Sequence, residues 1–258
     1  MRTTHVLACH PALAGAALLL AALAAGPAAA QAPASATTYT GPRFPGGPDS
    51  LRSALRRVAQ AAGAVPAGQV LVKVELDDAG RVRKATFLPP PPGSVASQLV
   101  RRPEVKAAAE QLRQLPAWQP GQAVNGPRQP LPLVLPLTFG GAGAPFSYSD
   151  ENPLFPLPAP RDARYLTFPY PLLDFTQRQV RYPAADLRAQ VQGTVYAYFE
   201  VSETGVLEQL RIAGSVSPTL DAEVLRVLQT IPSAQVPPRQ QGRPVRVAYV
   251  LPFNFHIQ

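Results

Sequence analysis

The chain has 258 residues, 46% of them apolar, and a formal net charge of +8. This length allows one large or two small domains. The 24 cations are scattered with no run longer than two, and no aromatic stacking motif lies among them. The charge therefore argues against a nucleic-acid partner and for weak attraction to an anionic envelope.

Residues 1–30 have the pattern of a secretory signal peptide. A head with one cation, Arg2, precedes an uncharged Ala/Leu run, and three alanines end at Ala30. We therefore expect cleavage after Ala30 and a periplasmic location. The alternative is an uncleaved anchor over 11–30 in the inner membrane, because this stretch is long enough to span a bilayer. Only a retained anchor would bring the chain into contact with the membrane.

Cleavage would change the chemistry that the chain can perform. Cys9 is the single cysteine and would leave with the signal, and His256 would be the last histidine. A disulfide, a thiol nucleophile and a multi-histidine metal site are then excluded. Asp221 and Glu223 lie two positions apart near a predicted helix start, where they do not face each other and where acids favour the helix dipole. We therefore expect a protein that is not an enzyme, with no catalytic residue, metal or cofactor.

An apolar phrase occurs twice in the chain, as VLPLTF at 134–139 and as VLPFNF at 250–255. The match continues without a gap over 115–139 and 231–255, which share seven identical residues in 25. The sequence therefore predicts two copies of one small domain.

Both copies have the same predicted elements. Upstream, GQVLVKVELDDAGRV at 68–82 corresponds to GTVYAYFEVSETGVL at 193–207, and in each the apolar residues alternate before a tight turn. Period two is typical of half-buried strands, and Gly80 and Gly205 are expected at positive φ in the turns. Apolar residues at helical spacing follow, with Thr219 as the expected cap in the second copy. Each copy then ends in a strand.

The predicted fold is α+β, with two tandem β-β-α-β domains, each a three-stranded antiparallel sheet with a helix on one face. A short helix is expected before the second copy, at 183–190. The expected organisation is a disordered segment at 31–43, a first domain at 44–139, a Pro/Gly-rich linker at 140–171 and a second domain at 172–258.

Residues 182–256 resemble the C-terminal domain of TonB-type energy transducers. The shared landmarks are Tyr-Pro at the opening, Gly-x-Val entering a long strand, a Gly turn, Leu-Asp at the helix start, Gly-x-Pro-Val before the last strand and a closing Pro-Phe-x-Phe. Residues 44–139 resemble the same domain more weakly, through FPGG at 44–47 and LPAWQPG at 115–121.

This resemblance implies a periplasmic protein-binding module in TonB-dependent transport. Such domains bind the TonB box, a short extended segment of an outer-membrane transporter, which adds as a strand beside the last strand of the domain. Full transducers also carry a membrane anchor and a long Pro-rich spacer, whereas only residues 31–43 separate the expected cleavage site from the first copy. A non-energised envelope adaptor or scaffold with the same fold, which holds another envelope protein, is therefore the alternative.

Prolines distinguish the two copies as acceptors of a strand. Successive N–H groups of a strand point to opposite neighbours, so Pro130, Pro132 and Pro136 remove donors along one edge of the first copy's last strand. In the second copy only Pro244 and Pro252 have the matching parity. Four donors remain there: Arg246, Ala248, Val250 and Asn254. We therefore expect the second copy to bind the partner and the first copy to be a spacer or a homodimerisation unit.

The last strand of the second copy is expected to carry the partner-binding residues: Val245, Arg246, Val247, Ala248, Tyr249, Val250 and Leu251. Arg246 and Arg243 would either pair with a partner carboxylate or remain solvated cations. Tyr196 and Tyr198 would either mark an exposed binding surface or pack across a sheet.

The signal-peptide prediction can be tested by the intact mass of the protein isolated from its own envelope. We expect a chain that begins at Gln31 in the soluble periplasmic fraction, because the small-residue triplet before it is a cleavage site. A chain that keeps residues 1–30 and fractionates with the inner membrane would contradict this prediction and favour an anchored TonB homologue.

Overall fold

The computed structural model describes residues 38–119, 121–124, 132–141, 144–158 and 168–257. These residues belong to one compact unit, Ser35–Gln258. The predicted signal peptide at 1–30 lies outside the described residues. Among the helices that the structure describes, none combines the length and apolarity needed to cross a bilayer.

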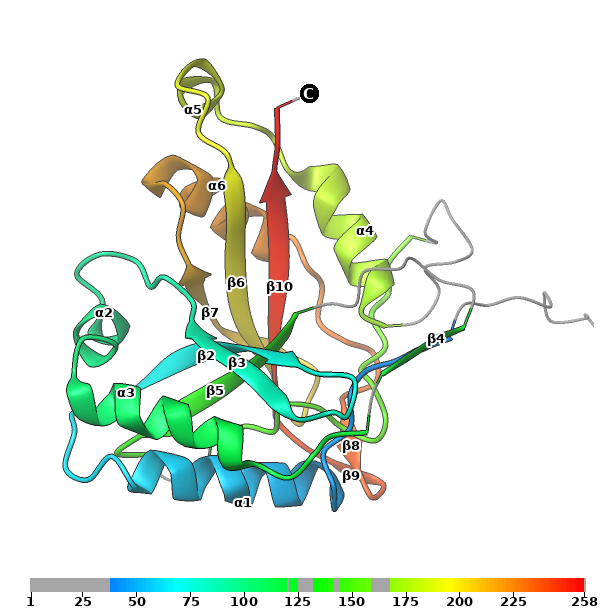
Figure 1. The fold of residues 1–258 in the computed structure, drawn as a ribbon. Coiled ribbons are helices and arrows are strands. Elements are labelled where there is room, and N and C mark those ends of the chain that lie inside the picture. The colour runs from blue at the N-terminus through cyan, green and yellow to red at the C-terminus, as the bar shows by residue number, and fades with distance from the viewer. Residues whose placement is uncertain (1–37, 120, 125–131, 142–143, 159–167, 258) are drawn as a thin grey trace, which may run out of the picture. The chain divides into compact units, whose positions relative to one another are not determined.

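The first half of the described chain is built on a three-stranded antiparallel sheet with the order β3-β2-β5. Figure 1 shows α1 and α3 side by side on one face of this sheet. The first half also contains a separate two-stranded antiparallel sheet, in which β1 pairs with β4. The elements are β1 (Thr38–Thr40), α1 (Gly47–Gln60), β2 (Gly68–Leu76), β3 (Val82–Phe87), α2 (Val95–Leu99), α3 (Pro103–Glu110), the 3-10 turn η1 (Gln111–Gln114), β4 (Gln122–Val124) and β5 (Leu133–Phe139).

The second half has a sheet with the corresponding order, β10-β6-β7. Helix α6 packs on β6 and β7, and α4 packs on α6 (Figure 1). The elements are α4 (Tyr170–Gln179), α5 (Ala184–Arg188), β6 (Gly193–Val201), β7 (Leu207–Gly214), α6 (Pro218–Leu228), β8 (Arg239–Gln240), β9 (Arg243–Pro244) and β10 (Val247–Phe255). The α+β class and the antiparallel three-stranded sheets are confirmed.

The cap of α6 differs from the prediction by two residues. Ser217, and not Thr219, is the N-cap, and its hydroxyl accepts a hydrogen bond from Leu220 N at 3.1 Å. Pro218 then occupies the first turn, where its missing N–H costs nothing. Thr219 lies inside the helix, and its hydroxyl donates to Asp186 of α5.

The two sheets share one pairing register. In each sheet a glycine opens the central strand opposite the phenylalanine that ends the last strand: Gly68 faces Phe139, and Gly193 faces Phe255. Within each last strand a proline stands at the same place, where Pro136 faces Leu71 and Pro252 faces Tyr196. Residues that the alignment of the two copies equates therefore occupy equivalent places in the two sheets.

The tight turn after each central strand is also built in the same way. Gly80 O accepts a hydrogen bond from Trp118 N at 2.7 Å, and Gly205 O accepts one from Ala234 N at 2.8 Å. Both glycines have positive φ, at 76° and 84°. A Cβ atom would lie 1.9 Å from Trp118 O in the first turn and 2.3 Å from Ala234 O in the second. Only glycine therefore fits where the returning chain crosses the turn.

Each sheet packs its helix-covered face into a separate core, and the opposite faces meet in a third. Leu71 and Leu88 of the first half are buried with Tyr198, Ala213 and Ala248 of the second half. Tyr198 is fully buried, so it does not form an exposed binding surface. The sequence pattern describes each sheet alone and carries no signal for what covers its second face.

The segment predicted as a linker, 140–171, is attached to the second half where it is described. Leu154 pairs with Val236, and the Phe155 side chain is buried in the core against Leu172 and its neighbours. Phe146 pairs with β10. The Pro and Gly content predicted an extended chain but carried no signal for these long-range contacts.

We expect Gly205→Ala to lower the free energy of unfolding by roughly 2–4 kcal/mol, because a Cβ adds a backbone clash to the strain of positive φ. Gly93→Ala is the matched control, since Gly93 has φ 77° but no atom lies within 4 Å of the place that its Cβ would take, and this change should cost about 1 kcal/mol. Urea unfolding followed by circular dichroism measures both. Equal losses in the two variants would contradict the account of the turn.

Candidate functional site: the outer edge of β10

Strand β10 lies at the edge of its sheet and pairs with β6 alone among the strands of that sheet. The register runs without a shift from Val247 opposite Val201 to Phe255 opposite Gly193. Ala248 N donates to Phe146 O at 2.8 Å, so this N–H points away from β6. Because strand periodicity is two, Val250 and Asn254 point the same way. This is the parity that the proline pattern predicts.

Prolines break this outer edge in both halves. Pro252 has the parity of Ala248, so its missing donor lies on the outer side and no bond to β6 is lost. Pro136 occupies the equivalent place in β5, and Pro132, which aligns with Ala248, precedes that strand. Pro130 lies outside the described residues. The outer edge of β5 therefore lacks the donor that β10 presents at Ala248.

The side chains of the predicted partner-binding residues serve mainly the protein's own core. Val247, Ala248 and Leu251 are buried, so these residues can offer a partner only their main chain. Tyr249 packs its ring against Phe168 and Phe199, with centroid separations of 5.0 and 5.7 Å. Burial raises the pKa of Tyr249.

The predicted site begins two residues before the strand does. Val245 N donates to Pro238 O at 3.0 Å, and β10 starts at Val247. Val250 is half-buried and belongs to the strand. The structure therefore aligns Val247–Leu251 along one edge and leaves Val245 in the preceding turn.

Phe146 occupies the first rung of the outer edge. Its N–H donates to Arg246 O at 3.0 Å, and its C=O accepts from Ala248 N. The pairing is parallel, with Phe146 opposite Val247. No sequence pattern indicated this residue, because it stands alone between glycines, prolines and serines.

Arg246 belongs to an ion-pair cluster within the chain. Its guanidinium lies 2.8 Å from a Glu208 oxygen, 3.3 Å from Glu200 and 3.8 Å from Glu203. Burial opposes the charge, but the field of Glu208 and the other carboxylates raises the pKa of Arg246. The cluster thus holds one cation among three carboxylates. The structure therefore disfavours the hypothesis that Arg246 pairs with a partner carboxylate, whereas Arg243 is exposed in β9.

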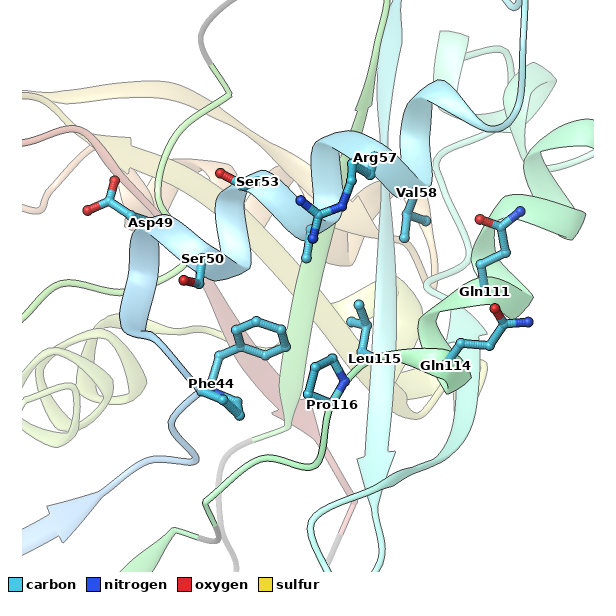
Figure 2. A pocket seen from close by; sticks show the side chains of 12 residues that line it. Phe44, Asp49, Ser50, Ser53, Arg57, Val58, Gln111, Gln114, Leu115 and Pro116 are labelled. Carbon is cyan, nitrogen blue, oxygen red and sulfur yellow. The ribbon is translucent and has the colours of Figure 1, made fainter.

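A cavity of about 610 Å³ lies in the first half, between α1 on one side and η1 with the two residues that follow it on the other. Figure 2 shows Ser53 and Arg57 on α1, with Phe44, Leu115 and Pro116 across from them. Within the described residues no three His, Cys, Asp or Glu side chains are placed to hold a metal ion.

The two acids weighed as catalytic candidates both have partners within the fold. Ser215 Oγ donates to Asp221 at 2.5 Å, although burial raises the pKa of Asp221. The hydrogen bond from Arg226 lowers the pKa of Glu223, which also accepts from Arg181 N at 2.7 Å. These contacts attach α6 to its surroundings.

Replacement of Arg246 tests the ion-pair cluster. We expect Arg246→Gln to lower the free energy of unfolding by about 1–2 kcal/mol, a value reduced for the solvent exposure of Glu203 and Glu208. Arg243→Gln, in the neighbouring exposed position, should change it by less than about 0.5 kcal/mol. Urea unfolding at low and high salt measures both, and the Arg246→Gln deficit should shrink as salt rises. Equal effects of the two substitutions would contradict the cluster's role.

Comparison with known proteins identifies the second half. The family model for the C-terminal domain of the Gram-negative bacterial TonB protein matches residues 178–257. No curated protein and no solved structure matches the chain. The matched residues contain the β10-β6-β7 sheet and α6. Residues 178–257 are therefore similar to a TonB C-terminal domain, and this similarity indicates a TonB-like role on the periplasmic side of envelope transport.

Proposed function

We propose that the TonB C-terminal domain binds the TonB box of an outer-membrane transporter as an added strand on the outer edge of β10. In β-augmentation the main-chain hydrogen bonds of a free sheet edge supply the affinity. Val250 and Asn254 present such donors, and within the described part of the chain no segment outside the sheet pairs with them. The partner would be an extended transporter segment, in TonB-dependent transport.

The observation that carries this proposal is the pairing of Phe146 with β10. An extended main chain from outside the sheet already makes two hydrogen bonds to this edge, at 3.0 and 2.8 Å. The edge therefore has the geometry for pairing with an extended chain. Its buried side chains keep β10 fixed while its main chain faces outward.

We also propose that residues 44–139 are a degenerate second copy of the domain that does not bind a strand. The shared register and the shared glycine turn support a common origin. Pro132 and Pro136 support the loss of binding, because they remove outer donors from β5. This copy then serves as a spacer that covers the open face of the second sheet.

An adaptor that holds another envelope protein would use the same edge. The two functions differ in the identity of the added strand and not in the chemistry of β10. Binding of TonB-box peptides supports the transport role. Binding of a strand from another envelope protein, with no response to TonB-box peptides, would support the adaptor.

Proline substitution at Val250 tests the proposed edge. Val250→Pro removes an outer N–H without removing a bond to β6, because it has the parity of the natural Pro252. We expect it to weaken the binding of TonB-box peptides from the same cell by at least about tenfold, as measured by isothermal titration calorimetry.

Val134→Pro is the matched control, because Val134 is the equivalent residue of β5, and it should leave the affinity unchanged. The melting temperature of each variant shows whether it has folded. Unchanged affinity in folded Val250→Pro, or an equal loss in Val134→Pro, would contradict the proposed site.

A further inference from the structure

The chain carries its own occupant for the edge of β10, the residues Pro145, Phe146 and Ser147, which we call the plug. Phe146 makes both main-chain hydrogen bonds of one parallel rung, to Arg246 O and Ala248 N. After this rung the chain leaves the edge, and the hydroxyl of Tyr148 accepts from Phe44 N at 3.2 Å in the first half. The plug therefore fills one rung and stops.

The Phe146 ring lies in a formed subsite. Only 7% of the residue is exposed, and the guanidinium carbon of Arg52, on α1, lies 4.6 Å from the ring centroid. Arg52 Nε is buried and has no hydrogen-bond partner among the described residues. Arg52 therefore contacts Phe146 through a cation–π interaction between its guanidinium and the aromatic ring.

The plug uses one of the few outward N–H donors of β10. The outward residues of β10 are Ala248, Val250, Pro252 and Asn254, and proline has no N–H. Three donors remain, and Phe146 uses the one at Ala248. A strand that left the plug in place would meet Val250, then a gap at Pro252, then Asn254. A strand that displaced it would gain the adjacent donors of Ala248 and Val250.

We propose that the plug competes with the partner strand for the outer edge of β10. The partner strand that displaces it runs parallel to β10 and carries an aromatic residue opposite Val247. This proposal rests on the proposed function of the β10 edge. The incoming aromatic ring takes the place of Phe146 against Arg52, and the incoming main chain takes over Arg246 O and Ala248 N. The first half contributes to selectivity because it supplies Arg52.

The test uses the full chain and a synthetic peptide that copies residues 144–150, APFSYSD. Phe146→Ala empties the aromatic subsite, so this variant should bind the peptide at least about tenfold more tightly than the unaltered chain, as measured by isothermal titration calorimetry. The peptide APASYSD, which lacks the ring, should bind the variant at least about tenfold more weakly than APFSYSD. Leu154→Ala is the matched control, because Leu154 is an exposed apolar residue of the same segment outside the plug, and it should behave as the unaltered chain.

A second substitution tests the aromatic subsite. Adding Arg52→Met to Phe146→Ala should reduce the affinity for APFSYSD and leave the weak affinity for APASYSD unchanged. Equal binding of APFSYSD by the unaltered chain and by folded Phe146→Ala would overturn the proposal, as would equal binding of the two peptides.

A further measurement uses the unaltered chain, so it tests the proposal even if Phe146→Ala does not fold. Amide hydrogen exchange of the unaltered chain should show that a bound TonB-box peptide removes protection from Phe146 N–H while Val250 N–H gains it. Protection that persists at Phe146 in the bound state would overturn displacement. If no TonB-box peptide binds either chain while APFSYSD still discriminates between them, the proposed function fails and the plug stands.

Discussion

The main-chain hydrogen-bonding capacity of β10 is the constraint on which the rest of this structure depends. A strand at the edge of a sheet exposes donors and acceptors that its own sheet cannot pair, and such an edge attracts any extended chain. Here the outer edge of β10 keeps only part of its hydrogen-bonding capacity. Pro252 removes one donor, Phe146 takes another, and Val250 stays available between them. This combination fits the strand-binding role that we propose, because a partly blocked edge is less prone to aggregate before the partner arrives.

The first half of the chain matters because a three-stranded sheet has two faces. Helices cover one face of each sheet, and the two remaining faces are buried against each other around Leu71 and Tyr198. Burial raises the pKa of Tyr198, and the hydroxyl donates to Glu200 at 2.5 Å. Glu200 in turn contacts Arg246. The buried face and the charged end of β10 are thus connected through Tyr198 and Glu200.

The sequence was informative wherever the determining contacts are local or repeated. Period-two alternation located the strands, and the twelve-residue spacing of glycines located the turns at Gly80 and Gly205. The alignment of the two copies indicated which strands correspond, but it carried no pairing between strands, and the register of each sheet is seen only in the structure. The long helix α1 was missed, although Leu51, Leu55 and Val58 follow helical spacing after Pro48. Its signal lay upstream of the residues that the two copies visibly share.

The contacts that decide the candidate site could not be predicted in the same way. Phe146 reaches β10 across about a hundred residues, and no local pattern records such a pairing. The exposure of Tyr198 stayed open, because alternation shows which residues share a face but not what covers that face. The ion pairs of Arg246 were not predicted, because its partners lie on other elements: β6, β7 and the loop between them. Each of these three contacts depends on how the elements pack together, whereas the sequence pattern describes the elements one at a time.

The most direct test of the central claim is residue-resolved amide hydrogen exchange of the full chain with and without a TonB-box peptide. The account predicts new protection at Val250 and Asn254 on the outer edge of β10, with little change in β5. Protection confined to β5, or protection elsewhere with none on β10, would contradict the assignment of the binding edge.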